Sequence, residues 1–174
     1  MVPAYPFADP MGSIISSRFS DDERNPTIAP STTRSSTQKE STMPHIVVHL
    51  SGQPDAALTR KTVDTVAELT QSVLGKALPV IAVTVQYIAA DSWFIGGKSL
   101  AELGKSAFHL DISVTDETNT KAEKARYLRE VHAAMARLRP DLHEVSYVHV
   151  IDARAAAYGY GGQTQEYRHQ QAGV

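Results

Sequence analysis

The chain has 174 residues, 42% of them hydrophobic, and a formal net charge of -2 at pH 7. This length and composition fit one globular domain with a core of its own plus a tail, and the scattered Lys and Arg residues form no basic face that favours nucleic acid or a membrane as a partner. The absence of cysteine excludes disulfides, thiolate metal sites and a cysteine nucleophile, and it favours a reducing compartment, by default the cytoplasm.

Residues 1–42 differ in composition from the rest of the chain. They are rich in Ser, Thr and Pro and have no apolar period, so they cannot bury enough surface to offset their chain entropy. We therefore predict a disordered extension, without the apolar core of a secretory signal. Two interpretations stay open, because Met43 could itself be the start: the segment is a solvated tail, or it is not translated.

The next segments predict a strand, a helix and a strand. The sequence "HIVVHL" (45–50) alternates as a half-buried strand, and "VIAVTVQYI" (80–88) is rich in β-branched residues. Between them lies a helical period with Pro54 at its start and Gly75 at its end. One helical stripe is expected to face the core: Leu58, Thr62, Val66, Leu69 and Val73.

The same order recurs in the second half. A strand is predicted at 106–115, a helix opened by the capping box Thr120 to Glu123, and a strand at 144–151. Each half closes on a glycine pair after an aromatic residue, in "WFIGG" and "YGYGG", and we expect neither pair to open a helix.

Two tandem βαβ units, 44–97 and 105–162, follow from this repeat, within a domain spanning 43–168 and followed by a tail, 169–174. The predicted fold class is α/β (α+β), with one four-stranded sheet and two helices on one face. The strands are interpreted as apolar on both sides, so the second face and the open edges predict self-association as a homotrimer.

Few chemistries remain for such a chain. The glycine pairs do not resemble a phosphate-binding loop, the seven histidines show no metal-ligand spacing, and no G-x-S-x-G sequence is present. We therefore expect no metal and no cofactor.

Pro44 remains as a candidate catalytic residue. An internal proline nitrogen is a non-basic amide, whereas a terminal proline is a secondary amine with a reference pKa of about 7.7 to 8.0. In an apolar pocket that pKa falls toward neutrality, where a general base works well.

The sequences "MPHIVVHL", "LTQSVLGKALPVIAVTVQYI", "FIGGKS" and "YVHVIDARAAAYGYGG" resemble the tautomerase superfamily, particularly 4-oxalocrotonate tautomerase and macrophage migration inhibitory factor. The resemblance covers residue 43 to about residue 168. It implies the tautomerase fold, removal of the initiator Met43, and Pro44 as the catalytic base that moves a proton between atoms of an enol or 2-oxo acid.

The resemblance also implies substrate-binding residues. Lys76 matches the family lysine that binds the substrate carboxylate just after the first helix. Tyr147 matches the tyrosine that reaches the proline of a neighbouring subunit, and His149 stands where the family has an asparagine. Tyr160 matches the aromatic rim of the pocket, with Tyr158 close by.

The arginines of 4-oxalocrotonate tautomerase are not matched. Pro54 and Thr84 occupy their places, which argues against diacid muconate substrates. Arg154, at the end of the last strand, could supply a bidentate carboxylate contact, an inference from its chemistry and not from a motif.

Structural interpretations compete with each assignment. Pro44 could be a strand-entry proline, Lys76 a solvated residue at a helix end, Tyr147 a core aromatic and His149 a strand histidine.

Three functions stay open: an isomerase acting on keto and enol forms of a small phenylpyruvate- or muconate-like acid, a catalytically silent binding or signalling protein, and a proline-dependent dehalogenase or decarboxylase. The last ranks third because no water-activating carboxylate can be placed beside Pro44.

Overall fold

The computed structural model describes residues 43–173, which lie in the second of the two compact units of the chain, Thr37–Val174. The predictions for residues 1–42 fall outside the described residues. Within residues 43–173, no helix is long and apolar enough to cross a membrane.

Two successive halves contain the same long elements. In each, a strand is followed by a long helix and a second strand, as the sequence predicts. The first half contains β1 (His45–Ser51), α1 (Ala56–Leu74), the 3-10 turn η1 (Leu78–Val80) and β2 (Ala82–Ile88); the second contains β5 (Phe108–Thr115), α3 (Lys121–Leu138) and β6 (Tyr147–Ala153).

Local signals set the ends of the long helices. Asp55, one residue after Pro54, caps α1, because its carboxylate accepts two backbone N–H groups of the first turn. The helix ends at Gly75, whose φ of 66° lies in the left-handed region that glycine adopts without strain. The capping box of α3 is confirmed, since Thr120 and Glu123 each accept the backbone N–H of the other, at 3.2 and 2.8 Å.

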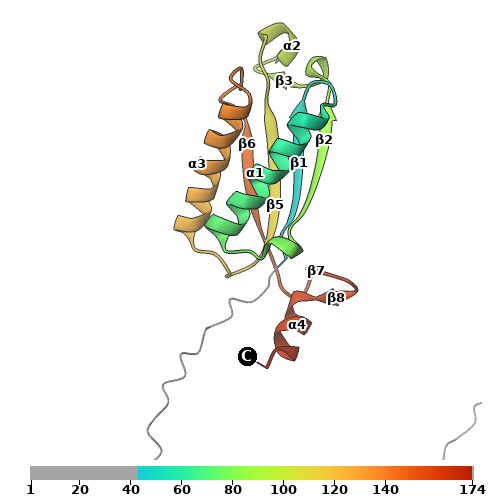
Figure 1. Ribbon diagram of the computed structural model, residues 1–174, viewed down its shortest axis with the longest axis vertical. Coiled ribbons are helices and arrows are strands. Elements are labelled where there is room, and N and C mark those ends of the chain that lie inside the picture. Colours follow the sequence, from blue (N-terminus) through green and yellow to red (C-terminus); the bar gives the residue numbers. More distant parts are fainter. Residues whose placement is uncertain (1–42, 174) are drawn as a thin grey trace, which may run out of the picture. The chain divides into compact units, whose positions relative to one another are not determined.

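The four long strands form one sheet in the order β2-β1-β5-β6. β1 runs parallel to β2 and antiparallel to β5, and β5 runs parallel to β6. The two long helices lie side by side across one face (Figure 1). This arrangement confirms the predicted fold class. The side chains between sheet and helices form the core: Ile46, Val48, Leu50, Val66, Val73, Leu74, Phe108, Leu110, Ile112, Val114, Tyr127, Val131 and Met135.

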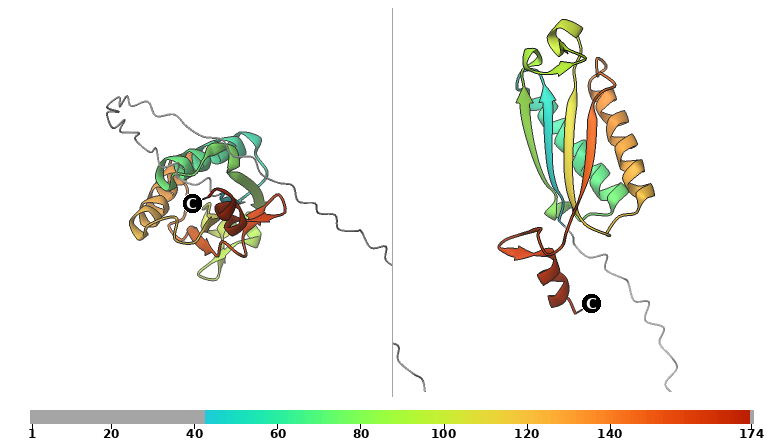
Figure 2. Two further views of the ribbon diagram at one scale, coloured as in Figure 1. Left: turned by 90° about the horizontal axis from the view of Figure 1, so that it is seen from below. Right: turned by 180° about the vertical axis from the view of Figure 1, so that it is seen from behind.

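The opposite face of the sheet is more polar than predicted. No helix of the described residues covers it (Figure 2). Because side chains alternate along a strand, the buried apolar residues of β1 and β5 turn toward the helices, and the residues between them, all polar except Val47, turn away. The expectation that the strands are apolar on both sides is therefore wrong. The polar side chains of this outer face are His45, His49, Thr84, Gln86, His109, Asp111, Ser113 and His149.

A small hairpin and a short helix follow each half. Each glycine pair forms the turn of a hairpin and opens no helix itself, but a Ser or Thr two residues later caps one: Ser99 caps α2 and Thr164 caps α4. The predicted boundary of the tail at residue 169 falls inside α4, which runs from Gln165 to Gln171. The hairpins are β3 (Phe94–Ile95) with β4 (Lys98–Ser99), after the 3-10 turn η2 (Ala90–Ser92), and β7 (Gly159–Tyr160) with β8 (Gln163–Thr164); the helices are α2 (Leu100–Leu103) and α4 (Gln165–Gln171).

Candidate active site

Pro44 lies immediately before β1 and is buried. Its carbonyl oxygen accepts the backbone N–H of Ala82 at 3.3 Å, which fixes it beside the start of β2. The nitrogen of Pro44 is acylated by Met43, so in the 174-residue chain it is an amide without basicity. The carbonyl of that amide is itself held within the fold, by Tyr158.

The hydroxyl of Tyr158 donates to two backbone carbonyls. One belongs to Met43, at 2.9 Å, and the other to Ser113 near the end of β5, at 3.3 Å. Burial raises the pKa of the Tyr158 phenol above its ordinary value, and a hydrogen bond with the backbone of His45 acts in the opposite direction. Tyr158 therefore keeps its proton at neutral pH and acts as a hydrogen-bond donor at the start of β1.

Lys76 lies at the same end of the sheet, where α1 ends. It is only 3% exposed, and its ammonium donates to Thr118 Oγ1 at 2.9 Å. Thr118 in turn donates to the carbonyl of Thr115 at 2.6 Å. Because the loop after β5 holds the ammonium, Lys76 is not the solvated residue of the structural interpretation.

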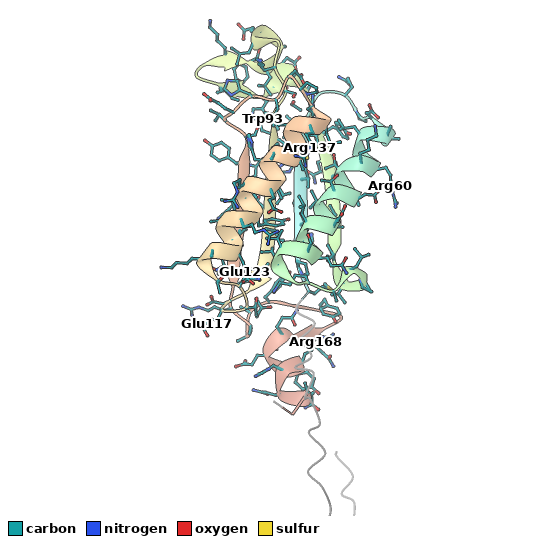
Figure 3. All side chains as sticks on the ribbon, turned by 60° about the vertical axis from the view of Figure 1, so that its left-hand side comes forward. Arg60, Trp93, Glu117, Glu123, Arg137 and Arg168 are labelled. Atoms are coloured by element: carbon teal, nitrogen blue, oxygen red, sulfur yellow. The ribbon has the colours of Figure 1, made fainter. Side chains whose placement is uncertain are left out.

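Other bonds tie the same two loops together. Asn119 donates to the carbonyl of Leu74 at 3.0 Å and lies 3.3 Å from the Glu123 carboxylate. Figure 3 shows Glu123 where α3 begins, at the end of the helical layer. The position of the Lys76 ammonium thus depends on contacts between the end of α1 and the start of α3.

Tyr147 and His149 lie away from Pro44 within one chain. Tyr147 pairs with His109 and His149 with Asp111, whereas His45, the residue after Pro44, pairs with Ser113. Along the strands, His45 is therefore separated from Tyr147 by roughly 13 Å and from His149 by roughly 7 Å. Tyr147 is 60% exposed. It does not take the place in the core that the structural interpretation gave it.

Asp111 holds His149 on the outer face. Its carboxylate oxygen lies 3.2 Å from His149 Nδ1 and 3.0 Å from His109 Nε2. The ring of His109 in turn lies 6.0 Å from that of His49. Sequence analysis missed this cluster, although the polar residues at alternate positions of β1 and β5 give a signal for it. Within residues 43–173, no group of His and acidic residues could hold a metal ion.

The remaining candidates lie after β6. Arg154 follows that strand directly and is exposed, and its carbonyl accepts the N–H of Ala157 at 2.9 Å in a turn. Tyr160 is half-buried in the last hairpin. The guanidinium of Arg168, on α4 (Figure 3), lies 3.9 Å from the centroid of its ring and donates to its carbonyl at 3.0 Å. One face of the Tyr160 ring is therefore already occupied.

Comparison with known proteins shows likeness at the level of structure. No family model and no curated protein matches the chain. A fused 4-OT described as a symmetric trimer aligns over 71% of this chain and 98% of its own, with 14% identity and a TM-score of 0.62. The protein Pt0534, inactivated by 2-oxo-3-pentynoate, aligns over 70% and 96% with 10% identity and a TM-score of 0.62. The macrophage migration inhibitory factor-like protein of Entamoeba histolytica aligns over 70% and 98% with 16% identity and a TM-score of 0.58.

These similarities confirm the predicted fold. The chain has the α+β fold of fused 4-OT and of macrophage migration inhibitory factor-like proteins, and the match covers nearly the full length of each of them.

Proposed function

We propose that this chain is a cofactor-independent tautomerase of the 4-oxalocrotonate tautomerase and macrophage migration inhibitory factor superfamily, with the secondary amine of Pro44 as its general base. The observation that carries this proposal is the position of Pro44. It is buried at the start of the first strand, and a tyrosine hydroxyl contacts the acyl group on its nitrogen. The fold is that of fused 4-OT and of a macrophage migration inhibitory factor-like protein.

The proposed reaction interconverts the keto and enol forms of a small 2-oxo acid such as phenylpyruvate. The Pro44 nitrogen takes a proton from C3, the electron pair forms the C2=C3 bond, and the C2 oxygen becomes an enolate that is then protonated. Lys76, held by Thr118 at the same end of the sheet, binds the substrate carboxylate. Removal of the residues before Pro44 is required, because acylation by Met43 leaves the nitrogen without a basic lone pair.

Two chains test this mechanism: the 174-residue chain, and a chain expressed from Met43, whose methionine is removable before proline. Residues 44–173 contain the whole core described above, so we expect the short chain to retain its fold. We expect phenylpyruvate turnover by the short chain and almost none by the long one. 2-Oxo-3-pentynoate should add covalently to a free Pro44 amine, so mass spectrometry should find Pro44 labelled in the short chain only.

The outcomes separate the candidate functions. Equal activity of the long chain, with its extension shown intact by mass spectrometry, contradicts the proline mechanism. A folded short chain that is neither active nor labelled favours the silent binding protein. The dehalogenase alternative has weak support, because Asp111 is bound to two histidines and Asp152 pairs with Lys124 at 2.6 Å.

We further propose a homotrimer. Among residues 43–173, no helix covers the outer sheet face, and the edge strands β2 and β6 each pair on one side only. Tyr147 and Ile151 are exposed on β6. Because Tyr147 and His149 lie on β6, away from Pro44 of the same chain, we propose that they serve the site of a neighbouring subunit. Fused 4-OT structures described as trimers support this assembly. Light scattering should give three times the chain mass, and a monomer at all concentrations contradicts it.

A further inference from the structure

The carbonyl of Met43 occupies a position next to the proposed base. Its carbon is bonded to the Pro44 nitrogen, and its oxygen accepts the Tyr158 hydroxyl at 2.9 Å. Because amide C–N and C=O bonds are about 1.33 and 1.23 Å long, the Tyr158 oxygen lies no more than about 5.5 Å from the Pro44 nitrogen. In the processed chain Met43 is gone, so the Tyr158 hydroxyl faces the site without the Met43 carbonyl as an acceptor.

The Met43 carbonyl oxygen marks a position beside Pro44 at which the Tyr158 hydroxyl meets an acceptor. A 2-oxo acid whose C3 is placed against the Pro44 nitrogen carries its own carbonyl oxygen two bonds from C3, on C2. We propose, on the basis of the function given above, that Tyr158 donates its hydrogen bond to this C2 oxygen and stabilises the enolate as Pro44 removes the C3 proton.

The proton count of this step is simple. Pro44 gains the C3 proton, the C2 oxygen gains the negative charge, and Tyr158 retains its own proton throughout as a neutral donor. The enolate then takes a proton from the Pro44 ammonium or from water, which completes the enol. The raised pKa of Tyr158 agrees with a group that donates a hydrogen bond without losing its proton at neutral pH.

The other polar groups are less suited to this role. The ammonium of Lys76 donates to Thr118, and His149 lies on β6, bound to Asp111. Tyr158 also keeps its position without Met43, because the Ser113 carbonyl remains as an anchor at 3.3 Å. The Ser113 carbonyl is the weaker acceptor because it lies further from the Tyr158 hydroxyl than the Met43 carbonyl does. A substrate oxygen can therefore take the place of the Met43 carbonyl oxygen as the main acceptor.

The test is Tyr158→Phe in the chain that begins at Pro44. Tyr87→Phe is the matched control: without Met43 the Tyr158 hydroxyl still donates to the Ser113 carbonyl at 3.3 Å, and the Tyr87 hydroxyl donates to the Asp55 carbonyl at 2.9 Å, at the start of α1. Both variants lose a tyrosine-to-carbonyl hydrogen bond, but only Tyr158 lies at Pro44. We expect kcat for phenylpyruvate to fall roughly 10- to 100-fold in Tyr158→Phe, at or below the loss seen for one oxyanion donor, with KM changed less than threefold.

Two further measurements isolate the role. Labelling of Pro44 by 2-oxo-3-pentynoate should still occur in Tyr158→Phe, and the acidic limb of the rate profile, which reports the Pro44 amine, should stay in place. An unchanged kcat in Tyr158→Phe, with the parent chain active, overturns the donor role and leaves the proline mechanism standing. An equal loss of kcat in Tyr87→Phe also overturns it, because a general structural cost then explains both. An inactive, unlabelled parent chain contradicts the proposed function itself.

Discussion

The two halves of the molecule share the same strand-helix-strand backbone but place different chemical groups at equivalent positions. Pro44 precedes the first residue of β1 that pairs with β2, and Phe108 precedes the first residue of β5 that pairs with β6. Phe108 is completely buried, and its backbone N–H donates to Ser146 Oγ at 3.3 Å. A residue in mid-chain cannot offer an amine, so the second half uses this position for packing.

The hairpins differ in the same way. The carbonyls of Trp93 and Tyr158 both accept the N–H of the first residue of the following helix, at 2.8 Å. Trp93 has no hydroxyl, whereas that of Tyr158 reaches the acyl group on Pro44. Repetition of a βαβ unit thus repeats backbone geometry, and the candidate site arises at one end only.

The largest expected contrast comes from the two equivalent positions. Phe108→Ala should lower the free energy of unfolding by about 3 to 5 kcal/mol, because it leaves a cavity in the core. Pro44→Ala, in the chain that begins at residue 44, should change stability little but lower kcat/KM about 100-fold or more, since a primary amine replaces the proline base. Urea unfolding and phenylpyruvate turnover measure the two effects. Equal losses of stability would remove the distinction between the halves.

A smaller effect is expected at Lys76. Lys76→Met keeps the buried apolar stem but removes the ammonium, so KM for a 2-oxo acid should rise roughly 10- to 100-fold, as for loss of a charge-assisted hydrogen bond. Lys105→Met is the control, because Lys105 also follows a left-handed glycine, Gly104, but is exposed. If KM is unchanged in a folded Lys76→Met variant, Lys76 serves only to join α1 to the loop after β5.

The smallest effect tests whether the halves unfold together. The hydroxyl oxygens of Tyr127 on α3 and Thr70 on α1 lie 2.9 Å apart, and Thr70 also donates to the carbonyl of Val66 at 2.7 Å, so this contact joins the two long helices. Burial raises the pKa of Tyr127 to about 12, and the bond with Thr70 acts in the opposite direction.

The sign of the pH effect follows from this shift. Below pH 10, Tyr127 is protonated in both states; between pH 10 and about 12 the unfolded chain loses the proton first, so stability falls by up to about 1.4 kcal/mol per pH unit. The fluorescence of Trp93, the single tryptophan, should report this loss although it lies in the other half. Tyr127→Phe should reduce the dependence of stability on pH. If the unfolding transition seen by Trp93 fluorescence does not change with pH in the unsubstituted chain, the two halves unfold separately.

Local sequence determined the long elements. Apolar alternation in β1, the helical stripe of α1 and the Thr120 to Glu123 capping box act over a few residues, so each could be predicted without knowledge of the rest of the chain. The tandem order of the elements then restricted the sheet topology. Pro44 was found from the sequence because its chemistry depends on its position in the chain.

Only the tertiary structure decided which partners these residues meet. Thr118, which holds Lys76, lies 42 residues further along the chain, and Tyr158 meets the Met43 carbonyl across 115 residues. Asp111 contacts both His109 and His149 because the register of β5 and β6 places Asp111 opposite His149. Local patterns encode backbone conformation and the buried side of each element, but a hydrogen bond between distant loops depends on how sheet, helices and hairpins pack together, and no short-range pattern records that.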